Sequence, residues 1–405
     1  MHGVIFVAPF FLETTLRFVE GVAALPGVRL GVVSQDPAEK IPLGLRSKLA
    51  AHSRIAEGLD PQQIRVAVED LGARLGGVHR LLGTLEQLQV PLAEVRERLG
   101  IEGMGVEAAR NFRDKARMKS VLAEHGLPCA RHRLVGTASE AREFALEVGF
   151  PIVVKPPAGA AAKDTFRADD DEALGRCLAR FPAAPVLLEE FIRGEEHSFD
   201  CVTIGGRMVW HSLTRYLPAC LDVMRNPWIQ WCVLLPREVD DPRYDGIRDA
   251  AQRALAALGM GTGLSHMEWF RRADGSVAIS EVGARPPGAQ FTTLISYAHE
   301  IDLYRSWARL VVFDAFDPPP RRFAAGIAFL RGQGSGRVFA IHGLDQAYRE
   351  VGPLVVEARL PTIGQTAGGG YEGEGYVVLR HRDTRTVEGA LKRLVELVQV
   401  ELRES

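Results

Sequence analysis

The 405-residue sequence predicts a multidomain protein of mixed α/β and α+β class. The first hundred residues alternate short apolar runs with helical patterns, which is typical of a parallel sheet covered by helices. Further along, strand-like runs flank Gly205-Gly206 and Asp274-Gly275, and these dipeptides favour β-hairpins. Pro318-Pro319-Pro320 is the clearest linker, and the part beyond it is glycine-rich and strand-like.

The first element that we expect is an N-terminal βαβ unit. Val4–Ala8 has the continuous apolar pattern of a buried strand, Thr14–Leu25 has a helical pattern, and Val28–Val33 resembles a second strand. Residues 61–100 are expected to be mainly helical, because apolar residues recur there at helical spacing. No G-x-G-x-x-G motif follows the first strand, which argues against a dinucleotide site.

Helices and strands continue to alternate after this unit. Asn111–His125 is expected to form one amphipathic helix, which Gly126 ends. Ile152–Lys155 and Val186–Glu189 have the apolar composition of short buried strands. A helix over Thr386–Leu402 is expected to close the chain.

Composition excludes several classes of function. A formal net charge of -2 gives no broad basic surface, so a nucleic-acid partner is not expected. The apolar run from Val4 to Leu12 is too short to span a bilayer and has no basic segment before it, so we expect neither a membrane span nor a signal peptide. The five cysteines have no C-x-x-C spacing and suit the reduced thiols of a cytoplasmic protein.

Lysine is scarce in this chain. Only seven of the 49 basic residues are lysines, and four of these lie between Lys115 and Lys163. A genomic codon bias would explain the excess of arginine. The remaining lysines are nevertheless candidates for a role that arginine fills poorly, such as a compact point charge on a phosphate.

The second hairpin contains two acidic residues that we expect to face each other. If Asp274-Gly275 is a two-residue turn, Phe270 faces Ile279 and Glu268 faces Glu281. Opposed carboxylates repel, and a cation between them would remove the conflict. Mg²⁺ suits such a pair, because it binds one or two carboxylates together with substrate phosphates. The alternatives are a solvated pair of carboxylates at a sheet edge, or a register that slips by one residue.

Two basic residues lie in loops that leave strands. Arg285 follows Glu281 by four residues, in a loop rich in proline and glycine, where it could stabilise charge on a transferred group. Lys155 ends an apolar strand before the small residues 156–162, whose backbone N–H groups could approach phosphates. A solvated arginine and an ordinary turn are the alternatives for these two features.

Other charged residues are less distinctive. Lys115 begins a helix, and Lys119, one turn later, is expected to face solvent. Residues 189–196 follow a buried strand and could present backbone groups to an adenine edge, with Glu196 on the ribose hydroxyls. A solvated acidic turn is the alternative for that segment.

In this order, the motifs resemble the ATP-grasp superfamily. More narrowly, they resemble its carboxylate–amine ligases, which include L-amino-acid ligases and biotin carboxylase-like enzymes. The resemblance implies a preATP-grasp βαβ domain over residues 1–105 and a two-subdomain ATP-grasp fold over 106–316, with a flexible lid at about 125–188. It also implies a small α+β C-terminal domain over 317–405.

The resemblance also implies a set of site residues, with ATP and Mg²⁺ (or Mn²⁺) as cofactors. Phosphate contacts would come from Lys115 and Lys155, beneath a closing loop at 156–165 that ends near Lys163. Adenine and ribose would be held by Glu189, Glu190, Phe191, Ile192 and Glu196. Glu268 and Glu281 would bind the metal, and Arg285 would act with Lys155 as a catalytic residue by holding the carboxylate substrate and the acyl phosphate. Gly283 departs from the family pattern, because many members have Asn there.

The implied activity is ATP-dependent ligation of a carboxylate to an amine. An acyl phosphate would form, an amine would attack it, and an amide or peptide bond would result with release of ADP and phosphate. Amino acids are the expected substrates, and a homodimer is common in this family. A purine-pathway or carboxylase-type ligase is one alternative, and a non-catalytic nucleotide-binding module, suggested by Gly283, is another.

Overall fold

The computed structural model describes residues 1–159, 164–182, 185–226, 228–368 and 370–404. Its N-terminal part is a four-stranded parallel sheet in the order β3-β2-β1-β4, as the βαβ pattern predicts. The strands are β1 (His2–Val7), β2 (Val28–Ser34), β3 (Ala51–Arg54) and β4 (Arg80–Leu82). The helices are α1 (Glu13–Ala23), α2 (Leu43–Arg46), α3 (Pro61–Leu75) and α4 (Gln89–Leu99). The short strand β4 interrupts the region predicted to be mainly helical.

Two helices lead away from this sheet. They are α5 (Val106–Arg113) and α6 (Lys115–Glu124), so the prediction of one helix over Asn111–His125 is wrong. Asp114 separates them, because its backbone is extended and its carboxylate accepts hydrogen bonds from the N–H groups of Ala116 and Arg117. The cap gives α6 a new start, and Lys115 is its first residue.

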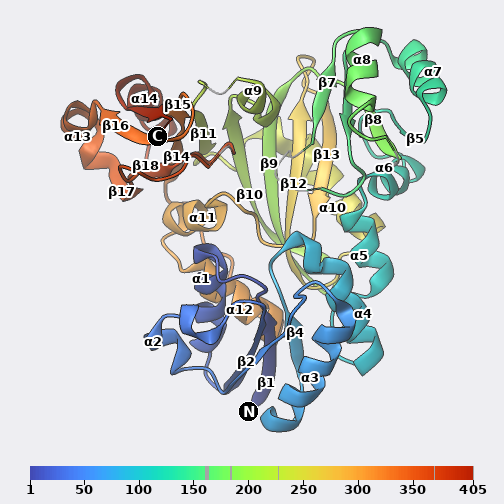
Figure 1. The fold of residues 1–405 in the computed structure, drawn as a ribbon, viewed down its shortest axis with the longest axis vertical. Coiled ribbons are helices and arrows are strands. Elements are labelled where there is room, and N and C mark those ends of the chain that lie inside the picture. The colour runs from blue at the N-terminus through green and yellow to red at the C-terminus, as the bar shows by residue number, and fades with distance from the viewer. Residues whose placement is uncertain (160–163, 183–184, 227, 369, 405) are drawn as a thin grey trace.

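A small four-stranded sheet follows, in the order β5-β8-β6-β7. Its strands are β5 (His132–Val135), β6 (Ile152–Lys155), β7 (Phe166–Ala168) and β8 (Val186–Glu190), and its helices are α7 (Ala138–Val148) and α8 (Asp171–Leu178). It has a core of its own, in which Phe144 packs with Ile152 and Leu188. In Figure 1 this unit projects from the upper right of the molecule.

An eight-stranded sheet forms the centre of the molecule, in the order β13-β12-β9-β10-β11-β14-β18-β17. Its strands are β9 (Glu195–Ile204), β10 (Arg207–Leu217), β11 (Trp231–Leu235), β12 (Gly263–Arg271), β13 (Val277–Gly283), β14 (Ala324–Leu330), β17 (Val355–Arg359) and β18 (Gly375–His381). The accompanying helices are α9 (Cys220–Arg225), α10 (Asp245–Leu258), α11 (Phe291–His299) and α12 (Leu303–Phe313). Both predicted hairpins are present, β9–β10 and β12–β13.

The part beyond the triproline segment joins this sheet rather than standing apart from it. Strands β14, β18 and β17 extend the sheet past β11. The remainder comprises α13 (Leu344–Val351), α14 (Thr384–Leu397) and a three-stranded sheet of β15 (Gly332–Gln333), β16 (Arg337–His342) and β19 (Gln399–Arg403). The closing helix therefore ends earlier than predicted, and a strand follows it. Domain boundaries at 105 and 316 stay a prediction.

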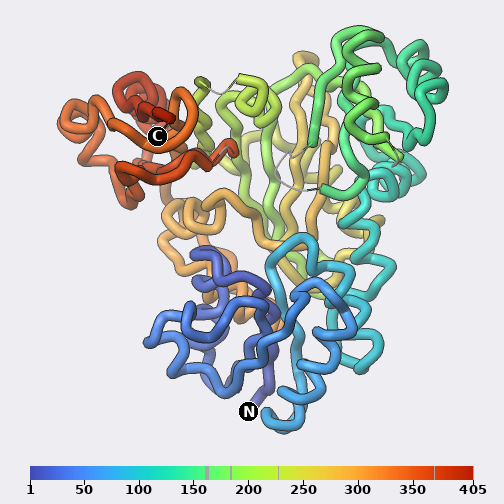
Figure 2. Tube along the Cα trace, viewed as in Figure 1, coloured from blue at the N-terminus to red at the C-terminus, as the bar shows by residue number. Residues whose placement is uncertain are grey.

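The N-terminal sheet and the central sheet share one hydrophobic core. Phe6 and Phe18 pack with Trp307 of α12, in the same cluster as Trp231 of the central sheet. Figure 2 shows the α11–α12 segment (orange) passing from the central sheet to the N-terminal unit (blue). Among the described residues, no helix is both long and apolar enough to cross a bilayer.

Buried His299 ends α11 beside the triproline segment. It is 3% exposed, its Nδ1 lies 3.2 and 3.0 Å from the carbonyl oxygens of Pro319 and Pro320, and its Nε2 accepts a hydrogen bond from Arg321. Burial, together with the charge of Arg321, lowers the pKa of His299 from 6.5 to about 3. The folded protein therefore holds this imidazole neutral at pH values where the unfolded chain protonates it.

We expect His299 to make stability fall as the pH drops from about 6.5 towards 3, because the unfolded state then binds the extra proton. Replacing His299 by Asn should flatten the pH dependence of the free energy of unfolding between pH 7 and 5, by up to about 1.4 kcal/mol per pH unit. Denaturant titration at several pH values measures this slope. His125→Asn, at an exposed position, is the control. An equal slope in His299→Asn and wild type would contradict the assignment.

Candidate functional site

One cavity of about 790 Å³ collects the predicted site residues that the structure describes. Its walls come from the N-terminal sheet, the small sheet and the central sheet. The predicted residues that line it are Lys115, Lys155, Glu189, Glu190, Phe191, Ile192, Glu196, Glu268, Glu281 and Arg285. Lys163 and the rest of 160–163 lie outside the described residues. Chain segments more than 150 residues apart therefore converge on a single concave site, as ligand sites commonly do.

Glu268 and Glu281 face each other across β12 and β13, as predicted. The turn and the register that produce this pairing differ from the prediction. The amide of Gly275 bonds to the carbonyl of Arg272, and the amide of Arg272 bonds to the carbonyl of Ser276, so the turn has three residues rather than two. This shifts the register by one, and Ile279 faces Trp269 instead of Phe270.

A β-bulge on β13 restores the expected pairing of the carboxylates. The register shifts again between Glu268 and Trp269, so that Ser280 is an extra residue on the β13 side. The prediction for Phe270 and Ile279 is thus wrong, while that for the two glutamates is confirmed. The longer turn shifts the register by one residue, and the bulge shifts it back.

The Glu281 carboxylate is ionised and ion-paired. Lys115 Nζ lies 2.6 Å from its Oε1 and also donates to the Gly159 carbonyl at 3.2 Å. Burial would raise the pKa of Glu281, but Lys115 and then Lys155 hold it at about 2. Glu268 lies opposite, 3.5 Å from the Tyr216 hydroxyl.

This donor set suits a magnesium ion. Two opposed carboxylates line the cavity, and the described residues contain no group of three or more His, Cys, Asp or Glu side chains that could hold a metal ion. Mg²⁺ commonly takes one or two carboxylates and completes its octahedron with water and substrate phosphate oxygens. The two glutamates fit that pattern, and they do not fit a site made wholly of protein ligands.

A buried triad of charges lies beside the carboxylates. Glu189 Oε1 is 2.8 Å from Lys155 Nζ and 3.3 Å from Lys119 Nζ. The prediction that Lys119 faces solvent is wrong, because it is 0% exposed. Lys119 lies four positions after Lys115, so both lysines lie on the same, inward-facing side of α6. The Glu189 side chain, which was predicted to hold the adenine, forms ion pairs with these lysines.

The pKa shifts within the triad follow from burial and charge. Burial lowers the pKa of Lys119, and Lys155 lowers it further, while Glu189 acts in the opposite direction. For Lys155 burial also acts to lower the pKa, but attraction from Glu189 and Glu281 outweighs it and raises the pKa. The pKa of Glu189 is lowered, because its two lysines overcome burial. Glu189 is therefore the anion that holds both lysines.

The rest of the predicted nucleotide segment lines the same cavity. Glu190 pairs with Arg131 at 2.6 Å near the surface, and the Phe191 ring lies 4.4 Å from the guanidinium of Arg167. Glu196 is 9% exposed, and its Oε2 accepts a hydrogen bond from the Cys220 amide at 2.7 Å. Burial, then repulsion from Glu268, raises the pKa of Glu196 to about 8.

Glu86, which sequence reasoning missed, anchors Arg285. Its Oε2 accepts hydrogen bonds from Nη2 and Nε of Arg285 at 2.7 and 3.2 Å, and its Oε1 accepts one from Arg113 at 3.2 Å. Glu86 is 7% exposed and follows β4 in the N-terminal sheet. Ligands of open parallel sheets lie beyond the carboxyl ends of the strands, so this position was a signal that sequence reasoning could have used.

His266 faces Gly283 in the hairpin, and it is held by Asp200. Its Nδ1 is 2.7 Å from Asp200 Oδ1, and its Nε2 is 3.8 Å from Glu268 Oε1. Burial would lower the pKa of His266, but Asp200 and Glu268 raise it to about 9. The imidazolium is thus another cation beside the opposed carboxylates, and Asp200 is the partner that sequence reasoning missed.

One wall of the cavity is aromatic. Tyr216 and Phe291 have ring centroids 5.7 Å apart, and Trp231 and Tyr371 have centroids 4.6 Å apart. All four rings line the cavity. Trp228 is 63% exposed and is absent from the lining. The site therefore joins a charged half to an aromatic half.

The chain is similar to known ligases. The family model for the ATP-grasp domain matches residues 120–299. The uncharacterized protein y4rH of Sinorhizobium fredii is 25% identical over 373 residues, covering 86% of this chain and 76% of its own length. An L-arginine-specific L-amino acid ligase of Bacillus subtilis is 25% identical over 248 residues, covering 59% of each protein. This chain thus aligns with about three fifths of that ligase.

A solved structure shares the fold over the whole chain. The L-amino acid ligase from Bacillus licheniformis superposes with a TM-score of 0.80, covering 100% of this chain and 99% of its own, at 17% sequence identity. At that identity the likeness shows the fold alone. It includes the N-terminal sheet and the C-terminal part, which lie outside the residues that the family model matches.

Because only Glu189 belongs to the buried triad, we expect substitution of Glu189 to destabilise the protein more than substitution of its neighbour Glu190. Glu189→Gln would leave Lys119 and Lys155 buried without a counter-charge, and we expect a loss of about 3 kcal/mol in the free energy of unfolding. Glu190→Gln is the matched control, because its ion pair lies at the surface, and we expect a loss below about 1 kcal/mol. Urea denaturation at pH 7 measures both. Equal losses would show that the triad does not hold this part of the structure together.

Proposed function

The chain belongs to the ATP-grasp superfamily, and we propose that it is an ATP-dependent carboxylate–amine ligase. The reaction forms an amide or peptide bond through an acyl phosphate and releases ADP and phosphate. The observation that carries the proposal is the convergence in one cavity of two opposed carboxylates, buried lysines and an anchored arginine. The N-terminal sheet supplies Glu86, so the catalytic arrangement uses more than the segment that the family model matches.

The charged half of the cavity binds ATP. Lys115 and Lys155 act as compact cations on the phosphates, and Lys163 adds a third from the loop at 156–165. The adenine lies against the segment from Glu189 to Ile192, where backbone groups rather than the Glu189 carboxylate recognise its edge. Glu196 accepts hydrogen bonds from the ribose hydroxyls.

Glu268 and Glu281 hold Mg²⁺ or Mn²⁺. When bound, this ion neutralises charge on the phosphates and lowers the cost of phosphoryl transfer. Gly283 offers no side-chain oxygen where many family members have Asn, so water or phosphate oxygens complete the coordination. Lys115 pairs with the Glu281 carboxylate in the structure, and it would stabilise charge on the phosphates when ATP binds.

Arg285 binds the carboxylate substrate and then the acyl phosphate. A guanidinium presents several N–H donors in a fixed fork that matches carboxylate and phosphate oxygens. Glu86 holds Nη2 and Nε of Arg285, which fixes the plane of the fork before substrate arrives. Charge stabilisation by groups that are already oriented requires no reorganisation during the reaction. Lys155 acts with Arg285 on the developing charge, and closure of the loop at 156–165 excludes water from the acyl phosphate.

Amino acids are the proposed acid and amine substrates. The aromatic wall of Tyr216, Trp231, Phe291 and Tyr371 suits an apolar or flat side chain on one of them. We further propose that the enzyme works in the cytoplasm as a homodimer, as is common in the family. A requirement for bicarbonate or formate in place of an amino acid would instead favour a purine-pathway or carboxylase-type ligase.

A screen for phosphate release over pairs of amino acids, with ATP and Mg²⁺, tests the proposed reaction. We expect release only when a suitable acid and amine are both present. Glu281→Gln should lower the rate by about a hundredfold or more, because the charge that balances the metal is lost. Glu195→Gln, an exposed neighbour of Glu196, is the control and should behave as wild type. ATP binding without release for any pair would favour a non-catalytic module, and full activity in Glu281→Gln would refute the metal assignment.

The role of lysine in nucleotide binding has a separate test. Lys155→Ala should weaken binding of ATP by about tenfold or more, because a buried charge on a phosphate is lost. Lys48→Ala, whose ammonium group is exposed, should leave the dissociation constant unchanged. Calorimetric titration with ATP and Mg²⁺ measures both. Unchanged affinity in Lys155→Ala, in a protein that still unfolds cooperatively, would contradict the phosphate role.

A further inference from the structure

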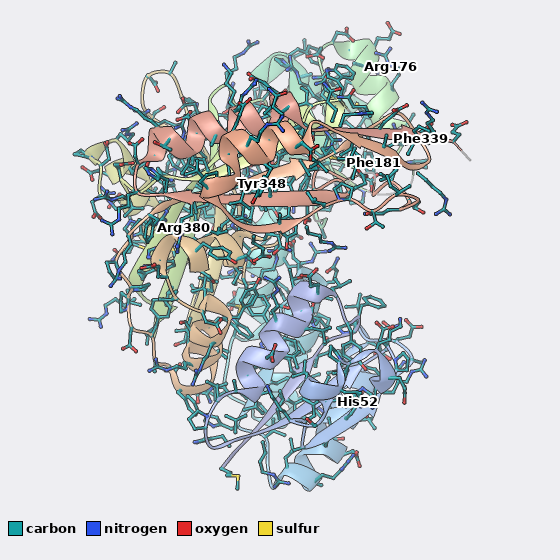
Figure 3. The ribbon with its side chains drawn as sticks, turned by 90° about the vertical axis from the view of Figure 1, so that its left-hand side faces the viewer. His52, Arg176, Phe181, Phe339, Tyr348 and Arg380 are labelled. Carbon is teal, nitrogen blue, oxygen red and sulfur yellow. The ribbon has the colours of Figure 1, made fainter. Side chains whose placement is uncertain are left out.

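A second, smaller cavity lies at the junction of the triproline segment with the central sheet. Its volume is about 350 Å³, and it is lined by Arg237, Glu300, Arg321, Arg322, Phe323 and Arg382. None of these residues lines the larger cavity. Figure 3 labels the neighbouring Arg380 near the end of β18, on the opposite side of the C-terminal part from Phe339.

The lining arginines come from separate segments of the chain. Arg237 follows β11, Arg321 and Arg322 precede β14, and Arg382 follows β18. Strands β11, β14 and β18 are neighbours in the central sheet, so the cavity sits at the same end of three adjacent strands. The positions of these arginines are therefore set by the sheet and not by one flexible loop.

The cavity has more positive charge than its carboxylate can balance. Glu300 is the only acid in its lining, and it already pairs with Arg322 at 3.2 Å and with Arg380 at 3.5 Å. Across the described residues, neither Arg237 nor Arg382 has a carboxylate within 4.0 Å. Two acids lie nearby in sequence, but among the described residues neither lies within 4.0 Å of a lining guanidinium. Glu238 accepts a hydrogen bond from Thr384, and Asp383 caps the N-terminus of α14.

Arg321 forms the inner wall, and its contacts are all with neutral groups. Its Nη2 donates to Ser212 Oγ at 2.6 Å, its Nη1 to the Pro236 carbonyl at 2.8 Å, and its Nε to His299 at 3.0 Å. Burial lowers its pKa to about 9, against weak attraction from Asp200 and Glu238. Arg321 is half-buried, and partial removal of a cation from water with no adjacent counter-charge is costly, so a bound anion would balance it.

An aromatic ring orders the outer arginines. The guanidinium carbons of Arg380 and Arg382 lie 4.4 and 5.8 Å from the centroid of the Phe323 ring. Stacking of this kind restricts long side chains, so less conformational entropy is lost when a ligand binds. The N–H donors of Arg382 form no hydrogen bond with any residue that the structure describes, and they remain available.

We propose that this cavity is a second anion site, which binds a small molecule bearing phosphate groups. Guanidinium groups that converge from several directions match the many oxygens of a phosphate, and each can donate two parallel hydrogen bonds. The volume of about 350 Å³ admits pyrophosphate or a short phosphate ester. The proposal stands independently of the ligase activity, because no residue of the larger cavity takes part.

Calorimetric titration with pyrophosphate, without ATP or metal, tests the proposal. Because pyrophosphate could also enter the larger cavity, the titration is made on wild type, on Lys155→Ala and on the double variant Arg237→Ala/Arg382→Ala. We expect Lys155→Ala to retain a binding event that the double arginine variant weakens about tenfold or more. Arg98→Ala/Arg207→Ala, which removes two exposed arginines elsewhere, is the control of equal charge and should bind as wild type.

Three results would overturn the proposal. The first is absence of any binding to the Lys155→Ala protein, which would place the ligand in the larger cavity alone. The second is equal weakening by the two double variants, which would indicate general charge attraction. The third is binding of citrate as tight as that of pyrophosphate, which would show that the site does not select phosphate. Equal unfolding temperatures of wild type and both double variants would establish that each fold is intact.

Discussion

Opposed carboxylates on neighbouring strands repel each other, and the charges around the larger cavity follow from that constraint. Glu268 and Glu281 face each other on β12 and β13. Lys115 pairs with Glu281, and the imidazole of His266 lies beside Glu268. Each of these cations is in turn positioned by a second contact, Lys115 by the Gly159 carbonyl and His266 by Asp200. The positive and negative charges of the site therefore balance, and each charged side chain is held in position by its neighbour.

The balance extends beyond the carboxylates into the other parts of the fold. Gly159 accepts hydrogen bonds from both Lys115 and Arg113, and Arg113 shares Glu86 with Arg285. A continuous series of hydrogen bonds and ion pairs thus connects the β12–β13 hairpin, through the Gly159 carbonyl, to Glu86 beside the N-terminal sheet. Because the hydrophobic core is also shared between that sheet and the central one, the N-terminal part holds Arg285 in place.

The fold class could be predicted from the sequence, because turn dipeptides and apolar runs are local signals. Most of the proposed site residues came instead from the resemblance to a known family, and the structure brings those that it describes into one cavity. The pairing of Glu268 with Glu281 was predicted correctly although the turn was not, since nothing in the sequence distinguishes Ser280 as a bulge. Lys119 was misplaced because its burial depends on Glu189, seventy residues away in the chain. The break at Asp114, in contrast, had a local cause in an N-cap residue, and it could have been recognised.

The continuous central sheet limits how this chain can be divided or exchanged. A triproline segment suggests a natural point of recombination between related genes, but β14 lies beyond it and pairs with β11 before it. In a chain that ended at the triproline segment, β11 would become an unpaired edge strand of the central sheet, and its apolar residues would be uncovered. A replacement segment from a relative would have to restore the β11–β14 register as well as the packing. The C-terminal part is therefore a continuation of the central sheet and not an interchangeable module.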